Sequence, residues 1–435
     1  MKKIRLFLTI ICSAMALAIV LISCSNPGFP YGGMDVQGDY GSPGNGTGYP
    51  TVAQQLAHWQ QAAYSFGYFD VVARADEVLY YTKIIHYLNR ENITITIRSY
   101  DNTRRVLSLN GNRAMFQVQG VNTTLVLENI FLQGHGGNYN SMIIVNQGSE
   151  LKMKTDSIIS GNLGRGVSVR GGVFTMRDNA TIAANMSEGV QVLHIPSRFY
   201  MLGNAQIHSN FGGMFAADGI VTMENDAQIR NNFRHGGVVI TGPHARLFMH
   251  DNTSIRNNAS SSNIMSAGGV FAQHRSRIYM YNNASISHNW NDSPLGGGGV
   301  TLSVDASLNM RGDVVRIDNN TSTRSRGGGV WMDSGYLNIS GGTIYGLDGT
   351  VSSYFLSTNM NNGLSKSFGI SPDVFHHALH KAPRPGHGQA QIDPVARTVD
   401  STGNVTGSLN RSSSGITITV TNYGTAGFWG GVPLP

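Results

Sequence analysis

Residues 223–232 read Met-Glu-Asn-Asp-Ala-Gln-Ile-Arg-Asn-Asn, and variants of this segment recur along the middle of the chain. A typical copy starts at a methionine, continues through Ala-x-Ile, and has an asparagine three residues after the isoleucine. Successive methionines are 23, 25, 22, 26, 31 and 30 residues apart and stand at positions 153, 176, 201, 223, 249, 280 and 310. A period of about 20 to 50 residues is typical of a solenoid, in which each repeat packs against its neighbours.

The pattern inside one repeat indicates which solenoid this is. Short apolar runs such as residues 238–240 and 247–249 follow strand periodicity and lack the i, i+3, i+4 spacing of a helix. Each repeat holds three of them: one after a glycine corner, one ending at the methionine and one around Ala-x-Ile. Three short strands in 22 to 31 residues are one coil of a parallel β-helix. We therefore predict an all-β solenoid, a right-handed parallel β-helix of about ten coils.

The recurring residues have predicted structural roles. The pair of Asp, Asn or Gly residues after each methionine suits a turn with positive φ, which these residues tolerate best. A ladder of stacked amides is predicted for Asn185, Asn210, Asn232, Asn258, Asn289 and Asn320. Two buried columns are predicted, one with Ile207, Ile229, Ile255 and Ile286, the other with Met201, Met223, Met249 and Met280.

The N-terminus has the features of a bacterial lipoprotein signal peptide, predicted to cover residues 1–23. Three basic residues precede an apolar core at residues 6–22, and the segment ends in a motif that resembles a lipobox with its cysteine at Cys24. The resemblance implies that Cys24 is acylated and becomes the mature N-terminus. The alternatives are an uncleaved membrane anchor and an ordinary signal peptide that contains a cysteine. The other cysteine, Cys12, would be lost with the peptide, which leaves no thiol for a disulfide.

Two segments of different amino-acid composition lie between the signal peptide and the repeats. Residues 24–50 are rich in Gly and Pro and are predicted to form a flexible tether. Residues 51–91 are predicted to form a helical cap, with helices around residues 53–59 and 75–88. A cap is expected because the open end of a β-helix exposes unpaired strand backbone.

The β-helix is predicted to occupy residues 92–346, with its first strand at residues 93–97. Beyond it the pattern dissolves, and residues 347–435 are predicted to be an irregular region. One strand is expected there, at residues 416–420, paired onto the last coil.

The net charge of the chain and the distribution of its arginines indicate which binding partners are expected. The 31 basic and 25 acidic side chains give a net charge of +6, and +3 remains without the three basic residues of the signal peptide. Because the arginines are scattered among turns, nucleic-acid binding is not expected. No second apolar stretch of about 18 residues follows the signal peptide, so no further membrane-spanning helix is expected.

Parallel β-helices include pectate lyases and polygalacturonases, so catalytic patterns are relevant. One or two acids per coil follow the repeat methionine, namely Asp156, Asp178, Asp226, Asp251 and Asp313. They alternate with Asn, which favours turn formation over a Ca²⁺ site that needs several acids together. Gly-His-Gly occurs at residues 134–136 and 386–388, but the Asp-Asp pair of polygalacturonases is absent from the sequence. We therefore expect no catalytic residue, no metal and no cofactor.

Two further groups of residues are candidate binding sites. The densest group of possible metal ligands comprises His376, His377, His380 and His387. On a helix, two of them would share a face at i, i+4 and chelate a metal; the alternative is a solvated loop. Three aromatic residues follow ladder asparagines and are expected along one edge of the solenoid: Phe211, Phe233 and Trp290. They either stack on sugars or cover the turns.

The Gly-Gly-Val corners and Ile-x-x-Asn turns resemble those of bacterial right-handed β-helix surface proteins of the pectin-lyase-like class. They are also similar to repeats of chlamydial polymorphic outer-membrane proteins, and their combination with a lipobox is similar to surface lipoproteins of spirochaetes. The resemblance covers about residues 90–345 and implies architecture more than activity. We expect a monomeric, lipid-anchored protein of the outer membrane or cell surface that acts as a non-catalytic adhesin or binding scaffold for a host-matrix or glycan ligand. The alternative is a polysaccharide-binding or polysaccharide-cleaving protein.

Overall fold

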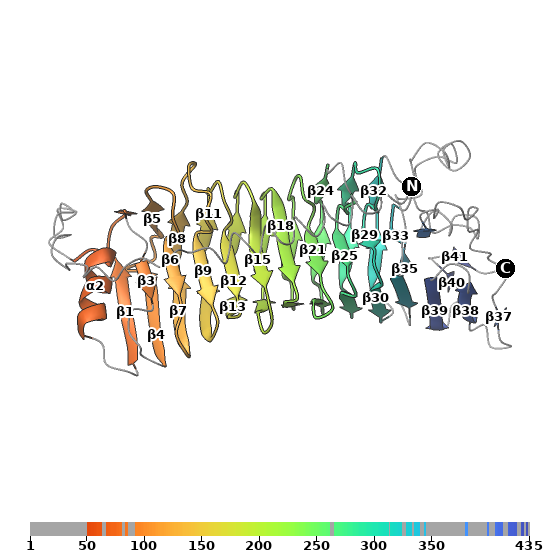
Figure 1. Ribbon diagram of the computed structural model, residues 1–435, viewed down its shortest axis with the longest axis horizontal. Helices are drawn as coiled ribbons and strands as arrows, with labels where there is room; N and C mark the ends of the chain where they lie inside the picture. The colour runs from red at the N-terminus through yellow and green to blue at the C-terminus, as the bar shows by residue number, and fades with distance from the viewer. Residues whose placement is uncertain are drawn as a thin grey trace, which may run out of the picture. The chain divides into compact units, whose positions relative to one another are not determined.

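A computed structural model describes residues 50–62, 67–80, 83–85, 92–261, 265–312, 314–323, 328–332, 335–339 and 343–344, together with strand segments beyond residue 378. Over these ranges the fold is a β-helix in which three strands and three turns make one coil (Figure 1). The predicted all-β class and the right-handed parallel β-helix are confirmed. This hand is expected because right-twisted strands pack back onto their sheet in that sense.

Three long sheets run along the stack of coils. Sheet A consists, in order, of β1 Gly67–Ala73, β4 Ile93–Ser99, β7 Thr123–Glu128, β10 Ser149–Lys154, β13 Val173–Met176, β16 Arg198–Met201, β19 Ile220–Met223, β22 Arg246–Met249, β26 Arg277–Tyr281, β30 Ala306–Arg311, β34 Gly335–Ile339, β39 Ile416–Tyr423, β38 Val405–Arg411 and β37 Thr398–Val399. Its strands are parallel as far as β39, and the last three are antiparallel to one another.

The other two long sheets have eleven strands each. Sheet B consists of β2 Glu77–Leu79, β5 Arg105–Leu109, β8 Ile130–Gln133, β11 Ile158–Ser160, β14 Thr181–Ala183, β17 Gln206–His208, β20 Gln228–Arg230, β23 Ser254–Arg256, β27 Ser285–Ser287, β31 Arg316–Asp318 and β35 Thr343–Ile344. Sheet C consists of β3 Lys83–Ile85, β6 Phe116–Val118, β9 Ile143–Asn146, β12 Val167–Arg170, β15 Glu188–Leu193, β18 Gly212–Ala217, β21 Val238–Thr241, β25 Val270–Gln273, β29 Val300–Leu302, β33 Val330–Met332 and β36 Leu379–Lys381. Eleven stacked strands are close to the predicted ten coils.

Two small sheets complete the described strands. One contains β24 Ala259–Ser260, β28 Trp290–Asn291 and β32 Thr321–Ser322, which lie at the turn between sheets B and C. The other is the antiparallel pair of β40 Phe428–Trp429 and β41 Val432–Pro433.

Equivalent residues pair in register, so inward side chains form continuous columns. The predicted methionine and isoleucine columns are both confirmed, with Met201, Met223, Met249 and Met280 in sheet A and Ile207, Ile229, Ile255 and Ile286 in sheet B. All eight side chains are fully buried. Each contributes about 1.5–3 kcal/mol through burial, but only because a neighbouring coil covers it.

The predicted asparagine ladder is also confirmed. The N–H and Nδ2 of Asn232 donate to Oδ1 of Asn258 at 3.1 and 2.9 Å, and the same pair of bonds links each ladder asparagine from Asn185 to Asn320. Each of these side chains is at most 1% exposed. A buried amide is tolerated because it is hydrogen-bonded, and here the bonds join successive coils.

The turns explain the recurring small residues. The first Asx residues after the methionines, among them Asp178, Asn225 and Asp251, have φ between 55° and 60°, as predicted. At the glycine corner the constraint is space: a Cβ on Gly213 would lie 2.2 Å from the carbonyl oxygen of Gly237 in the next coil. Only glycine allows the two backbones to approach this closely.

The N-terminal cap begins with the helix α2, Val52–Ala62. Thr51 and Gln54 form a capping box, because the Gln54 N–H donates to Thr51 Oγ1 and the Thr51 N–H donates to Gln54 Oε1. The carboxylate of Glu77 accepts the Val52 N–H at 2.7 Å, which stabilises the positive end of the helix. Among helices of the described ranges, none is both long and apolar enough to cross a membrane.

The helix closes the edge of sheet A. The side-chain amide of Gln55 donates to the carbonyl oxygen of Val72 at 2.8 Å and accepts the Val72 N–H at 2.9 Å, as a neighbouring strand would. Leu56 and Trp59 are buried against the first coil, with the Trp59 ring 5.4 Å from that of Phe69. The predicted capping role of this segment is confirmed for α2.

The prediction of a second helix over residues 75–88 is wrong. β2 and β3 lie in this segment and pair in parallel with β5 and β6, so the first coil starts at Gly67 and not at residue 92. Val78 is 48% exposed, whereas its neighbour Leu79 is buried, as in a strand with one face turned inward. Pairing with the next coil overrides the local helical pattern.

The C-terminal prediction is partly confirmed. The strand expected at residues 416–420 is β39, which pairs with β34 on the last coil. The description of residues 347–435 as irregular apart from that strand is wrong, because β36, β37, β38, β40 and β41 also lie there and β36 extends sheet C. Most of these strands are two or three residues long, too short for an alternating pattern.

Candidate functional site

The acids that follow the repeat methionines hold the turns of neighbouring coils. Asp251 accepts hydrogen bonds from the Asn225 N–H at 3.0 Å and from Asn282 Nδ2 at 3.1 Å. In the adjacent column, Asp226 accepts a hydrogen bond from Asn252 Nδ2 at 3.1 Å. Across the described ranges, no group of three or more His, Cys, Asp or Glu side chains is arranged to hold a metal ion.

The aromatic residues predicted along one edge lie at the turn between sheets B and C. Phe211 and Phe233 are in edge-to-face contact, with ring centroids 5.4 Å apart. Trp290 lies further along the same edge, but Ala259 is its direct neighbour and separates it from Phe233. The common edge is confirmed, although the strip of rings is interrupted.

This edge is apolar and open to solvent. Met186, Phe233 and Trp290 are 51%, 48% and 38% exposed, and Phe211 is half-buried among them. The guanidinium of Arg234 lies 5.0 Å from the Phe211 ring centroid. We call these five residues the edge cluster. Exposed aromatic, methionine and arginine side chains in one place are typical of interaction sites.

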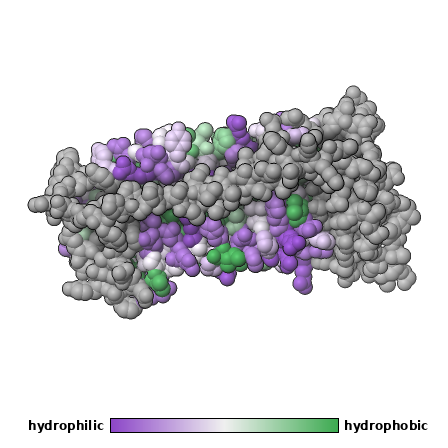
Figure 2. Space-filling model, in the orientation of Figure 1, coloured by the Kyte–Doolittle hydropathy of each residue, from purple (hydrophilic) through white to green (hydrophobic). Residues whose placement is uncertain are grey.

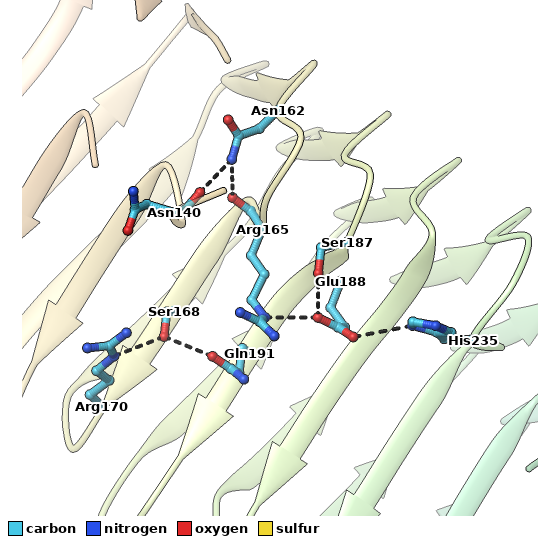
Figure 3. Close-up of polar contacts among 9 residues, drawn as sticks. All are labelled: Asn140, Asn162, Arg165, Ser168, Arg170, Ser187, Glu188, Gln191 and His235. Carbon is cyan, nitrogen blue, oxygen red and sulfur yellow. Dashed lines mark hydrogen bonds and ion pairs between the residues drawn. The ribbon is translucent and has the colours of Figure 1, made fainter. Parts of the chain in front are cut away.

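A polar network adjoins the edge cluster, and Figure 3 shows its members Arg165, Ser187, Glu188 and His235. Glu188, at the start of β15, accepts hydrogen bonds from Arg165 Nε and Ser187 Oγ, both at 2.8 Å. Its other oxygen lies 3.4 Å from Nδ1 of His235, which precedes β21. The His235 ring is also in edge-to-face contact with Phe211 at 5.0 Å. The network therefore ties the aromatic edge to the coils on either side.

Gly212 makes this network possible. It pairs with Glu188 in sheet C, and a Cβ on it would lie only 3.0 Å from Cβ of His235. The missing side chain lets His235 reach across one coil to Glu188. Burial raises the pKa of Glu188, but the hydrogen bond from His235 and the charge of Arg165 outweigh it and lower the pKa to about 2. Such a carboxylate is a weak base near neutral pH, so we interpret it as a clamp between coils.

A second organised surface is the outer face of sheet A. Phe248 stacks on Tyr279 with centroids 4.9 Å apart and planes 8° apart, and His250 stacks on Tyr281 at 4.7 Å and 9°. We call these four rings the ring block. Because neighbouring strands are about 4.8 Å apart, each ring covers a face of the ring on the next coil.

Arginines flank the ring block. Arg246 and Arg277 are direct neighbours at the start of β22 and β26. Arg198 lies two coils before Arg246 in the same column, and Arg311 follows Tyr281 in its column. Burial and the charge of Arg277 lower the pKa of Arg246. The arginines thus form a like-charged group on this face.

The ring block and its arginines were not predicted from the sequence. Their signal is present at residues 246–250 and 277–281, which read Arg-Leu-Phe-Met-His and Arg-Ile-Tyr-Met-Tyr. Reading the outward positions of each strand separately from the core positions identifies them.

Several predicted site residues lie outside the described residues, namely Cys24, His376, His377, His387 and Asp313. His380 lies in strand β36, so the helical spacing proposed for a metal site does not apply to it. Within the first Gly-His-Gly motif, His135 accepts the Gly137 N–H through Nδ1 at 3.0 Å.

Comparisons with protein-family models, with curated proteins and with solved structures found no match to this chain. The β-helix architecture therefore rests on the structure itself, and the relationship to pectin-lyase-like, chlamydial or spirochaete proteins stays a prediction.

Proposed function

We propose that this protein is a lipid-anchored component of the cell envelope that works as a non-catalytic binding scaffold. The edge cluster carries this proposal, because it exposes three large apolar side chains and one arginine on a rigid, laddered turn. Residues of these types dominate the binding energy of protein interfaces, and Phe233 and Trp290 also offer rings to a glycan. The ligand is a host-matrix protein or a glycan.

The hydrogen bonds accepted by the acidic side chains favour a binding scaffold over an enzyme. Asp226 and Asp251 accept hydrogen bonds from neighbouring turns, and Glu188 accepts bonds from three side chains. A glycan-cleaving site requires a second acid or base at a defined separation and a group poised to exchange a proton near neutral pH. The carboxylates of Asp226, Asp251 and Glu188 are instead bound to neighbouring coils of the stack.

The sequence around Cys24 supports anchoring, and the surface supports exposure to solvent. The described surface in Figure 2 is largely hydrophilic, with separate hydrophobic patches. A protein tethered by lipid needs no apolar belt of its own, because the acyl chains supply the membrane affinity.

The test uses the full chain, purified in detergent, on an array of glycans and host-matrix proteins. We expect at least one ligand to bind, and the variant Phe233→Ala to weaken that binding roughly tenfold, as removal of an interface hot spot does. A matched aromatic substitution on another face, Tyr200→Ala, should change it less than about twofold. No binding to any arrayed ligand would contradict the scaffold function.

The same preparation is incubated with pectate, alginate, hyaluronan and chondroitin, with and without Ca²⁺. Neither reducing ends nor unsaturated products should appear. Cleavage that disappeared on Glu188→Gln would favour the polysaccharide-cleaving alternative.

A further inference from the structure

We infer that the outer face of sheet A from β16 to β30 lies against an anionic phospholipid surface, that of the membrane holding the lipid anchor. This assignment deepens the proposed function, on whose lipid anchor it rests. It gives the solenoid a membrane-facing side, with the edge cluster at the corner opposite sheet A.

The charge of this face requires an anionic partner. None of the ion pairs found among the described residues includes Arg198, Arg246, Arg277 or Arg311. On the described strands of this face the acid is Glu224, in the column of His250. Asp218 and Asp305 lie at the adjoining turn, where Asp218 lies near Arg246 and binds the His244 N–H. Four guanidinium groups therefore share the strand face with one carboxylate.

The N-terminal half of the same face is different. Arg98, Lys152 and Lys154 each form an ion pair with an acid on this face, at Asp70, Glu150 and Glu128 respectively. The described cations of the face that are in no ion pair are thus Arg177, at the end of β13, and the four arginines around the ring block. Acids on the outer face of sheet A can therefore pair with its cations, but none of the described ion pairs includes an arginine beside the ring block.

The rings favour a lipid surface over a polysaccharide. A sugar stacks on an open aromatic face, but the faces inside the ring block are covered by the rings of the adjacent coil. The block presents ring edges and the hydroxyls of Tyr279 and Tyr281 instead. Ring edges are positively polarised, and tyrosine is enriched at the headgroup level of bilayers, where a ring can keep its hydroxyl in water.

Because the lipid anchor holds the solenoid close to its membrane, a weak attraction between sheet A and the lipid surface is sufficient for contact. Residues 24–50 can span at most about 95 Å, at 3.3–3.6 Å per residue. A body held within that distance has an effective concentration against its own membrane on the order of millimolar. Each arginine close to an anionic surface adds to the attraction, and the attraction is screened by salt. On the described strands β16, β19, β22, β26 and β30, no large apolar side chain is exposed, so the contact is electrostatic and reversible.

The test places a photocrosslinking amino acid at Thr222, beside the ring block, or at Gln228 on the outer face of sheet B. The full, lipid-anchored chain is reconstituted in vesicles of phosphatidylcholine with phosphatidylglycerol. We expect lipid adducts at position 222 to exceed those at 228 at least about fivefold. The difference should disappear in vesicles of phosphatidylcholine alone and at about 0.5 M salt.

Two double variants distinguish the effect of the arginines on sheet A from the effect of the net charge of the protein. Arg246→Gln with Arg277→Gln should reduce the adducts at position 222 roughly tenfold. Arg230→Gln with Arg256→Gln removes an equivalent arginine pair from sheet B and should leave them unchanged. Circular dichroism and melting temperature establish that both variants fold.

Four results would overturn the assignment. The first three are equal adducts at positions 222 and 228, adducts that persist in the Arg246/Arg277 variant, and binding of the full chain to chondroitin sulfate that only this variant loses. The third would show that the face binds a polysaccharide and not a lipid surface. A chain that associates with vesicles but shows no adducts at position 222 refutes this assignment and leaves the proposed function intact. A chain that fails to acquire lipid at all refutes the anchor itself.

Discussion

At the scale of single residues, the buried asparagines of the ladder each serve two coils. Asn232 donates to Asn258 and accepts from Asn210, so its amide is satisfied on both sides. Loss of one such amide leaves unpaired groups on both neighbours, which costs more than the hydrogen bond itself. Loss of one side chain from an apolar column likewise affects two neighbours, because each coil covers the buried side chains of the next.

Ile229→Asp should be severely destabilising. The side chain is fully buried in the isoleucine column, and a carboxylate there would be charged without a partner or protonated without hydrogen bonds. We expect a loss of about 4 kcal/mol or more in the free energy of unfolding. Thermal melting followed by circular dichroism measures it. The control Gln228→Asp, one residue away and facing outward, should shift the melting temperature little; similar melting of the two variants would show that the register is wrong.

Glu188→Gln should remove a pH-dependent part of the stability. The folded pKa is lowered from 4.5 to about 2, so the charged form is stabilised by roughly 3 kcal/mol. This contribution is fully present above about pH 4.5 and is lost as the pH falls towards 2. The difference in melting temperature between wild type and variant should therefore be large at pH 7 and vanish near pH 2. A difference that did not change with pH would contradict the clamp; Glu224→Gln is the control and should change stability little.

At the scale of elements, no strand of the described coils is stable by itself. Most strands of sheets B and C have three or four residues, and their hydrogen bonds go to strands of the coils above and below. Among the described strands, β1 is the first of sheet A, and α2 takes the place of a preceding strand through Gln55. A helix that supplies one side-chain amide to a sheet edge protects the edge from pairing with another molecule.

Gln55→Ala should open the edge of β1. The N–H and C=O of Val72 would lose their partners, and we expect a loss of about 1–3 kcal/mol together with self-association. Light scattering after size-exclusion chromatography measures the association. His58→Ala, on the exposed side of the same helix, is the control and should stay monomeric. A monomeric Gln55→Ala protein with wild-type stability would show that the cap does not depend on this contact.

At the scale of the whole molecule, the described coils have different chemistry on different sides. Sheet A carries the ring block and its arginines, and the corner between sheets B and C carries the edge cluster. A three-sided coil places that corner opposite sheet A. A protein tethered to a membrane at one end can therefore contact lipid with one side and a ligand with the other.

Cys24→Ala should abolish anchoring. We expect the variant to accumulate as an unprocessed precursor without lipid, because the proposed lipobox makes the Cys24 thiol the site of the first acylation. Incorporation of labelled palmitate in the producing bacterium measures this, with Cys12→Ser as the control that should label normally. Wild-type labelling of the Cys24→Ala chain would disprove the lipobox assignment.

The sequence by itself determined the architecture of this protein, because its strands and turns are encoded locally and repeated. The spacing of the methionines, Ala-x-Ile and the asparagines predicted the parallel coils, both core columns and the amide ladder, and all of them are confirmed. Tertiary structure decided the rest. The strands at residues 77–79 and 83–85 form because the next coil pairs with them. Glu188 meets His235 only because Gly212 has no side chain, and the ring block exists only in one register. Repeats of 22 to 31 residues differ in their turns, so the residues that become neighbours across coils depend on how each turn folds.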